Sequence, residues 1–163
     1  MSASAPSSSI TTRREFQAAL RDAFAEAAQT GCREMWLTDV DFADWPLGEP
    51  EVIDNLRTWA RPHRKLTLLA QNFDTVARRH PRWVDWRRMW SHVVECRSNT
   101  ELEAGQMPTL LLAPGLVSVR LADPLRFRGS VSHDAASLLR AREAIAAVLD
   151  RSNPDFPSTV LGV

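Results

Sequence analysis

The chain has 163 residues, a length that fits one domain, and hydrophobic residues make up 44% of it. Its formal net charge is zero, and its two cysteines, Cys32 and Cys96, are far apart in the sequence, which argues against a disulfide framework, a zinc ribbon and a redox pair. The longest apolar run, Leu110 to Ala113, is far shorter than the roughly 20 residues that span a bilayer, so no membrane partner is expected.

The chain begins with small polar residues. The first ten lack the basic start and the apolar stretch of a secretory signal, so we expect a cytoplasmic protein. We expect residues 1–11 to be a disordered lead-in, residues 12–151 to form a single α/β domain, and residues 152–163 to form a tail. Nineteen of the twenty basic residues are arginine, which is typical of a GC-rich bacterial genome.

Thr12 and Glu15 have capping-box spacing and predict the start of a helix, which Gly31 ends. Further along, apolar periodicity and turn residues define alternating elements. The pattern predicts a strand at 34–38, a loop at 39–50, a helix at 51–60, a strand at 66–70, a helix at 73–91 with a break at His80-Pro81, and a strand at 92–97.

The pattern changes after residue 98. Two strands, 109–113 and 116–121, flank Pro114-Gly115 as a hairpin, residues 125–128 add a short piece, and Ser132 caps a final helix to Asp150. The alternation of helix and strand before that point favours parallel pairing through right-handed crossovers. The predicted fold is α/β, with a mainly parallel or mixed central sheet of about 5–6 strands and helices on both faces.

Charge is distributed unevenly along the chain. Residues 1–56 carry 4 basic and 10 acidic side chains, a net charge of −6, whereas residues 57–97 carry 10 basic and 3 acidic ones, a net charge of +7. A basic segment attracts phosphate-bearing partners through long-range electrostatic steering. The alternative is that it faces the acidic first third of the same fold.

Residues 78–92 alternate arginine with tryptophan. Aromatic faces that stack on bases, with cations that follow the phosphates, are typical of single-stranded nucleic-acid binding. However, Trp83, Trp86 and Trp90 are three and four residues apart, so on a helix they share one face. Arg82 and Arg88 fall outside that face. The segment is therefore either a nucleic-acid surface or a helix with buried tryptophans and solvated arginines.

Polar side chains follow the carboxyl ends of the three predicted strands, the edge at which open α/β sheets bind ligands. We expect them to converge on one candidate ligand-binding rim, with loop solubility and helix capping as the alternative. A histidine at the helical break joins this set, although it suits a bond to a backbone carbonyl equally well. The candidates are Asp39, Asp41, Asn72, Asp74, His80 and Arg97.

The sequence carries no recognisable catalytic or cofactor motif. No two of the four histidines have the three- or four-residue spacing of a zinc pair on a helix. The six glycines are scattered and form no phosphate-binding loop, and no serine has the setting of a nucleophile elbow. We therefore predict no catalytic residue, no cofactor and no metal, and the sequence argues against an enzyme.

The order of elements, together with Trp36-Leu37, Trp59-Ala60-Arg61, the strand Leu66 to Ala70, and His80-Pro81-Arg82 before Trp86-Arg87, resembles an uncharacterised bacterial domain family. The similarity covers residues 12–151. Members of that family look like one half of a phospholipase-D-type fold, and some are attached to an acetyltransferase domain. The resemblance implies a phospholipase-D-like topology, and a homodimer because halves of that fold normally pair.

Phospholipase-D-type enzymes carry the motif H-x-K-x-x-x-x-D after the third strand, in which the histidine attacks phosphorus and the lysine holds phosphate oxygens. Pro108, Leu110 and Gly115 stand at the matching places in this chain. These residues offer neither a nucleophile nor a charge, so the resemblance implies a degenerate active site without that chemistry.

Three functional hypotheses follow from the sequence. The first is a non-catalytic binding or regulatory domain with a degenerate phospholipase-D-like fold. The second is an enzyme that acts on a phosphorylated or anionic small molecule at the candidate rim. The third is nucleic-acid binding through the Arg/Trp segment 78–92.

Overall fold

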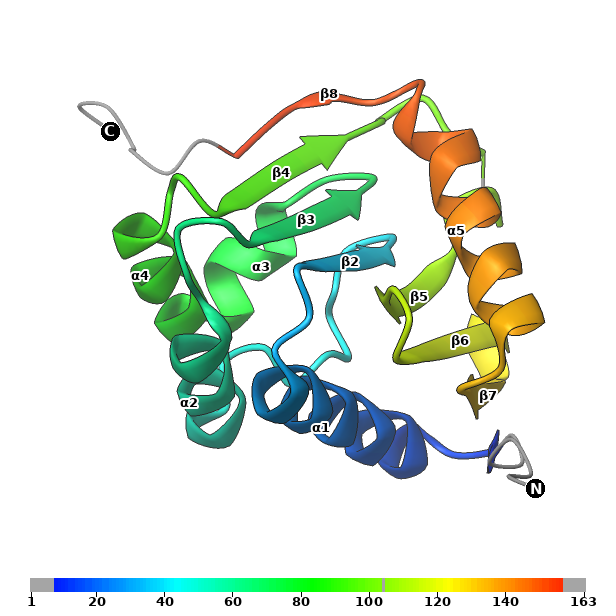
Figure 1. Cartoon of the computed structure of the whole chain (residues 1–163). Coiled ribbons are helices and arrows are strands. Elements are labelled where there is room, and N and C mark those ends of the chain that lie inside the picture. Colours follow the sequence, from blue (N-terminus) through cyan, green and yellow to red (C-terminus); the bar gives the residue numbers. More distant parts are fainter. Residues whose placement is uncertain (1–7, 104, 157–163) are drawn as a thin grey trace.

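The computed structural model describes residues 8–103 and 105–156, and Figure 1 shows how their elements are arranged. The helices are α1 (Arg13–Thr30), α2 (Pro50–Trp59), α3 (Asp74–Arg79), α4 (Pro81–Met89) and α5 (Ala135–Leu149), and a 3-10 turn, η1, covers Pro124–Arg126. The strands are β1 (Ser8–Ile10), β2 (Glu34–Asp39), β3 (Lys65–Ala70), β4 (Val94–Ser98), β5 (Thr109–Ala113), β6 (Val117–Asp123), β7 (Arg128–Ser132) and β8 (Asn153–Pro154).

These eight strands form one sheet in the order β1-β7-β6-β5-β2-β3-β4-β8. The β2·β3 and β3·β4 pairings are parallel, and the other five are antiparallel. The prediction of a mainly parallel or mixed sheet of about 5–6 strands is therefore wrong in size, and the sheet is mixed and mostly antiparallel rather than mainly parallel. Helical crossovers produce only the β2-β3-β4 part, whereas β5, β6 and β7 follow one another as an antiparallel meander whose first strand pairs with β2.

The piece predicted at 125–128 overlaps the turn η1, and β7 begins only at its last residue. Two further strands that the sequence did not predict, β1 and β8, are short and lie at the sheet edges. β1 pairs with β7, and β8 pairs with the end of β4. Both are rich in polar residues or proline and lack the apolar alternation that identifies a strand, so backbone pairing with a neighbour decides their conformation. β1 and β8 lie outside the predicted domain range 12–151. Residues 1–7 and 157–163 of the predicted lead-in and tail lie outside the described residues.

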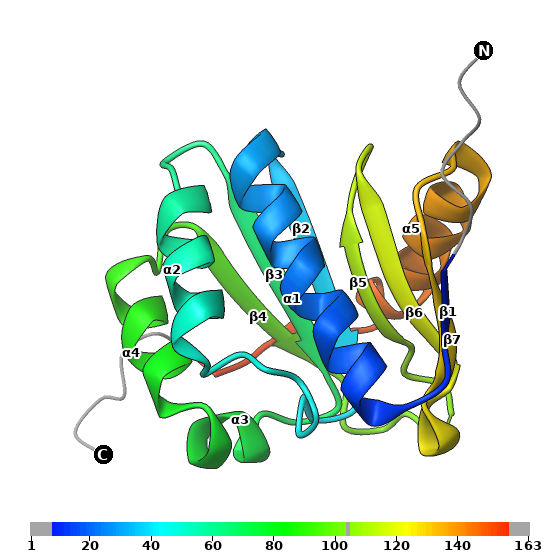
Figure 2. The same ribbon diagram turned by 90° about the horizontal axis from the view of Figure 1, so that it is seen from below.

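Helices cover both faces of the sheet (Figure 2). In β5, Leu111 and Ala113 belong to the cluster that contains apolar residues of α1 to α4, whereas Leu110 and Leu112 pack with Ile145 of α5. Because successive side chains of a strand point to opposite faces, α1 to α4 lie on one face and α5 on the other.

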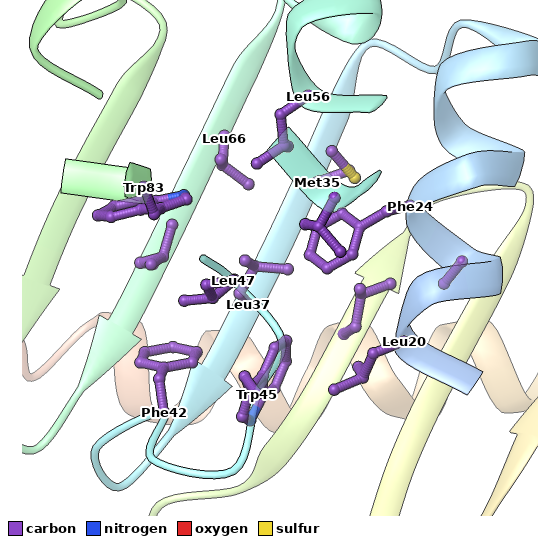
Figure 3. Packing of buried hydrophobic residues seen from close by; sticks show 14 of the residues in the cluster. Leu20, Phe24, Met35, Leu37, Phe42, Trp45, Leu47, Leu56, Leu66 and Trp83 are labelled. Atoms are coloured by element: carbon purple, nitrogen blue, oxygen red, sulfur yellow. The ribbon is translucent and has the colours of Figure 1, made fainter. Parts of the chain in front are cut away.

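The main core lies between the sheet and helices α1, α2 and α4 (Figure 3). The loop between β2 and α2, predicted as an acidic loop from its Asp, Gly and Pro residues, contributes three large side chains to this core. Phe42, Trp45 and Leu47 are 0%, 2% and 0% exposed, and the rings of Phe42 and Trp45 lie edge to face with centroids 5.0 Å apart. The loop is thus packed into the fold and holds a fixed position beside α3 and α4.

The termini of α1 follow the signals in its sequence. The Thr12 hydroxyl accepts a hydrogen bond from the Glu15 amide at 3.1 Å, and Gly31 ends the helix at a φ of 80°, a conformation that favours glycine.

The start of α5 differs from the prediction. Asp134 caps this helix by accepting a hydrogen bond from the Ser137 amide at 3.0 Å, whereas Ser132 belongs to β7.

Candidate nucleic-acid interface

Residues 74–89 form two short helices that meet at His80 and Pro81. Pro81 occupies the first turn of α4, where its missing amide hydrogen is tolerated. His80 is 6% exposed, and its Nε2 lies 2.8 Å from the carbonyl oxygen of Phe42. Burial lowers the pKa of His80 and favours the neutral ring, which can donate this hydrogen bond. The histidine therefore links the helix break to the β2–α2 loop.

The tryptophans of this segment lie on its inner side. Trp83 and Trp86 are 0% and 4% exposed, and their ring centroids are 6.4 Å apart. Figure 3 shows Trp83 among the core residues. Trp90 is half-buried, with its ring 5.6 Å from that of His92. Because Trp83 and Trp86 are enclosed by protein, these rings cannot stack on the bases of a nucleic acid.

The arginines at the start of the segment lie on its outer side, where Arg78, Arg79 and Arg82 are exposed. We call these three residues the arginine surface. Arg79 donates a hydrogen bond to a backbone carbonyl of the β2–α2 loop at 3.2 Å. Within residues 8–103 and 105–156, none of the three forms an ion pair with a carboxylate. Their charges therefore remain available to a partner.

A cavity of about 550 Å³ lies beside the arginine surface and is lined in part by Arg79, Arg82 and Arg13. Its wall also contains Glu49, whose carboxylate accepts hydrogen bonds from Arg21, the shorter one 2.7 Å long. Because this acid already has a cationic partner, it does not neutralise the arginine surface. The cavity gives the arginine surface a concave, positively charged flank.

Asp39, a candidate of the predicted rim, connects three parts of the fold. Its Oδ1 accepts a hydrogen bond from the Thr109 hydroxyl at 2.7 Å, and its Oδ2 accepts one from the Phe42 amide at 3.0 Å. Burial raises the pKa of Asp39, and these hydrogen bonds oppose the increase. The carboxylate thus joins the end of β2 to its own loop and to the start of β5.

Three further rim candidates make local contacts. Asp41 Oδ1 accepts a hydrogen bond from the amide of Ala43 at 3.0 Å, and Asn72 Oδ1 accepts one from the amide of Asp74 at 3.2 Å. Asp74 is exposed in the first turn of α3, where a negative charge suits the helix dipole. These are the contacts of turns and helix starts.

Arg97, the remaining rim candidate, fastens the last strand to the sheet. Its guanidinium donates to the hydroxyl and to the carbonyl oxygen of Ser152, both at 2.8 Å, and to Glu95 at 3.0 Å. Glu95 also forms an ion pair with Lys65 at 2.8 Å, and these partners lower the pKa of its carboxyl. The group is a structural ion-pair network at the β4 edge.

Arg87 is a candidate that was not recognised from the sequence. It is 4% exposed and lines a second cavity of about 550 Å³. A signal for its burial was present, because Arg87 follows Trp83 by four residues and precedes Trp90 by three. The spacing that groups the tryptophans on one helix face places Arg87 on that face too.

Potential metal ligands and the two thiols can be located in the part of the chain that the structure describes. No three His, Cys, Asp or Glu side chains there lie together as a metal site would need. Cys32 and Cys96 are free, and burial raises the pKa of both thiols, that of Cys96 to about 12. The same residues contain no helix with the length and apolar character of a membrane span.

Comparison with known proteins finds no matching family model and no matching curated protein. A solved structure does match, that of the archaeal chromatin protein TrmBL2, with a TM-score of 0.62 at 11% sequence identity. The fold is similar to that of TrmBL2. The match covers 91% of this chain and 54% of TrmBL2, so the chain spans about half the length of that protein. TrmBL2 binds DNA.

The likeness to TrmBL2 corrects the topology that the sequence resemblance implied. The structure is similar to TrmBL2, and the predicted phospholipase-D-like fold is wrong. Two of the residues that carried the resemblance, Leu37 and Trp59, are fully buried, and Trp36 lies half-buried beside α5. Apolar core residues of this kind fit many α/β sheets and do not determine how the strands are connected.

Proposed function

We propose that this protein binds nucleic acid through phosphate contacts made by the arginine surface. The observation that carries the proposal is the exposure of Arg78, Arg79 and Arg82 without a carboxylate partner in the described residues. An arginine guanidinium presents a fork of donors that matches phosphate oxygens. The DNA binding of TrmBL2, whose fold is similar, supports the same class of partner.

Electrostatic pairing inside the fold leaves the basic middle of the chain largely unmatched. Two acidic residues of the first third form ion pairs with arginines of the same region. Arg13 pairs with Asp44 at 2.8 Å, and Arg21 pairs with Glu49 at 2.7 Å. Within the described residues, the ion pair that joins the two regions is Arg57 with Asp54, neighbours in α2. Internal neutralisation therefore does not account for the charge of the arginine surface.

The buried tryptophans decide the kind of binding. Because Trp83 and Trp86 cannot stack on bases, the interaction consists of phosphate contacts, which carry little sequence information. Such binding depends strongly on salt and has dissociation constants of about 10⁻⁴ to 10⁻⁶ M at physiological salt. Duplexes of unrelated sequence are expected to bind with similar affinity.

The test is a titration of the full chain into a fluorescently labelled duplex, followed by anisotropy. The triple variant Arg78→Gln, Arg79→Gln, Arg82→Gln is expected to bind at least about tenfold more weakly, because three exposed contacts of about 0.5 kcal/mol each are removed.

The matched control carries the same change of charge on the α5 side of the sheet, as Arg120→Gln, Arg140→Gln, Arg142→Gln. These arginines are exposed, and the control is expected to bind like the wild type. Equal loss in both triple variants would show a net-charge effect and contradict a defined surface. If the wild type does not bind the duplex at low salt at protein concentrations up to about 10⁻⁴ M, nucleic-acid binding itself is contradicted.

A further inference from the structure

The cavity that contains Arg87 lies at the edge of the sheet, away from the arginine surface. It is bounded by the end of α4, the beginning of β4 and the end of β8, which runs along β4 in Figure 1. Its volume of about 550 Å³ falls within the range of small-molecule sites. The polar and charged residues of its wall include Lys65, Arg87, Ser91, His92, Glu95 and Asp155.

Arg87 lines this cavity as a buried charge that forms no ion pair with the described acids of the wall. The side chain is 4% exposed, and its Nε is buried with no hydrogen-bond partner in the described part of the chain. Among the same residues it forms no ion pair. Buried cations in proteins are normally paired, because the loss of hydration of an unpaired ion is costly.

The polar neighbours of Arg87 do not supply the missing negative charge. Arg87 interacts with the thiol of Cys96, whose pKa of about 12 keeps it neutral, and its guanidinium carbon lies 5.2 Å from the ring centroid of Phe156. Glu95, an acid of the same wall, is held by Lys65 at 2.8 Å and Arg97 at 3.0 Å. The single negative charge of Glu95 is already shared by two cations, so it does not neutralise Arg87, and Asp155, the other acid of the wall, forms no ion pair with Arg87 within the described residues.

We propose that this cavity binds a small molecule through an oxyanion group, a carboxylate or a phosphate, that pairs with the Arg87 guanidinium. Both groups fit the two-donor fork of arginine and supply the ion pair that Arg87 does not form with any carboxylate of the described residues. Asp155 of the same wall forms no ion pair within the described residues and can receive a positively charged part of the ligand. The proposal does not depend on nucleic-acid binding.

The test follows the Arg87 Nε–Hε signal of the ¹⁵N-labelled full chain by NMR during titration with inorganic phosphate, acetate or glycine at constant ionic strength. A saturable shift with at least one probe is expected. Phosphate and acetate distinguish the two kinds of oxyanion. Glycine compared with acetate shows whether Asp155 also recognises an ammonium group. Failure of all three probes to produce a saturable shift overturns the proposal.

Variants assign the binding to Arg87, with affinities for the strongest probe measured by calorimetry. Arg87→Met is expected to lower the affinity for this probe at least about 30-fold, because one side of a buried charge pair is lost. The neighbour control Arg88→Met changes an exposed residue and should leave it unchanged. The arginine-surface triple variant should also retain it, which separates this site from phosphate bound by Arg78, Arg79 and Arg82.

Arg87→Lys keeps the positive charge but removes the two-donor fork, so it is expected to bind the probe more weakly than the wild type. This variant replaces Arg87→Met should the latter fail to fold. Wild-type affinity in the folded Arg87 variant would overturn the assignment.

Discussion

Two groups of arginines in the same pair of helices have opposite surroundings. Arg78, Arg79 and Arg82 are exposed on the outer side, whereas Arg87, one turn after Trp83, is buried beside a cavity. Water hydrates an exposed guanidinium, so each outer arginine contributes little energy and acts through summed charge. Burial removes most of the water that would hydrate Arg87, so a single ionic partner stabilises its charge more than a partner of an exposed arginine would. Exposure therefore indicates whether an arginine serves a diffuse or a specific interaction.

The largest expected effect concerns the face that carries Trp83. Trp83→Ala should lower the free energy of unfolding by about 3–5 kcal/mol, because a fully buried indole leaves a cavity. Met89→Ala on the same helix changes a side chain that is 77% exposed and should stay within about 0.5 kcal/mol. Urea denaturation measures both. Similar values for the two variants would contradict the inward orientation of the tryptophans.

Arg87 should behave unlike an ordinary surface arginine. In buffer without phosphate or carboxylate, Arg87→Met is expected to raise the free energy of unfolding by about 1–3 kcal/mol, since an unmatched buried charge is removed. The matched variant Arg88→Met should change it by no more than about 0.5 kcal/mol. A clear loss of stability in Arg87→Met would show that the charge has a partner within the fold.

Thr109 tests the junction that Asp39 forms between β2, its loop and β5. Thr109→Val removes the 2.7 Å hydrogen bond to Asp39 and leaves that carboxylate less well paired, which should lower the free energy of unfolding by about 1–3 kcal/mol. Thr58→Val, at an exposed position of α2, is the control. Chemical denaturation that gave equal changes for both would rule out a structural role for the Asp39–Thr109 contact.

His80, which lies between Arg79 and Arg82 in the sequence, gives a pH-dependent readout. Burial lowers its pKa below 6.5, so the unfolded state binds more protons and the stabilising contribution of His80, complete above pH 6.5, is lost as pH falls through the lowered pKa. Between about pH 7.5 and about pH 5.5, wild-type stability should fall more steeply than that of His80→Gln. The raised pKa of Asp39 acts in the opposite sense and is common to both proteins. Parallel stability curves would contradict the burial of His80.

The smallest stability effects belong to the arginine surface. Single changes Arg78→Ala and Arg82→Ala should alter the free energy of unfolding by no more than about 0.5 kcal/mol, because both side chains are exposed and unpaired within the described residues. Thermal unfolding compares them with the wild type. A larger loss would assign these residues a structural role and weaken the case for a binding surface.

Local signals in the sequence were reliable where spacing alone decides the structure. The Thr12 cap, the end of α1 at Gly31 and the helix break at His80-Pro81 were all predictable. The spacing of Trp83 and Trp86 indicated a shared buried face, and the same spacing, applied to Arg87, would have revealed that residue as well. The burial of Arg87 was not predicted because charged residues are usually exposed to solvent.

Long-range pairing was not predictable in the same way. β1 and β8 are too short and polar to have a periodicity of their own, and the position of β5 beside β2 depends on contacts between distant parts of the chain. The β2–α2 loop is rich in acidic residues, so the sequence did not indicate that Phe42 and Trp45 are buried. Their burial depends on the core against which they pack. The phospholipase-D-like topology, and with it the basis for a homodimer, came from the order of elements and from short motifs, and neither determines how the strands pair.

The dependence of duplex affinity on salt tests the central claim most directly. Each phosphate neutralised by an arginine contributes about −0.9 to the slope of log K against log salt concentration for duplex DNA. The wild type and the Arg120, Arg140, Arg142 triple variant should share one steep slope. The Arg78→Gln, Arg79→Gln, Arg82→Gln variant should have a slope shallower by about 2 to 3. A wild-type slope near zero, or an unchanged slope in that variant, would contradict the role of the arginine surface.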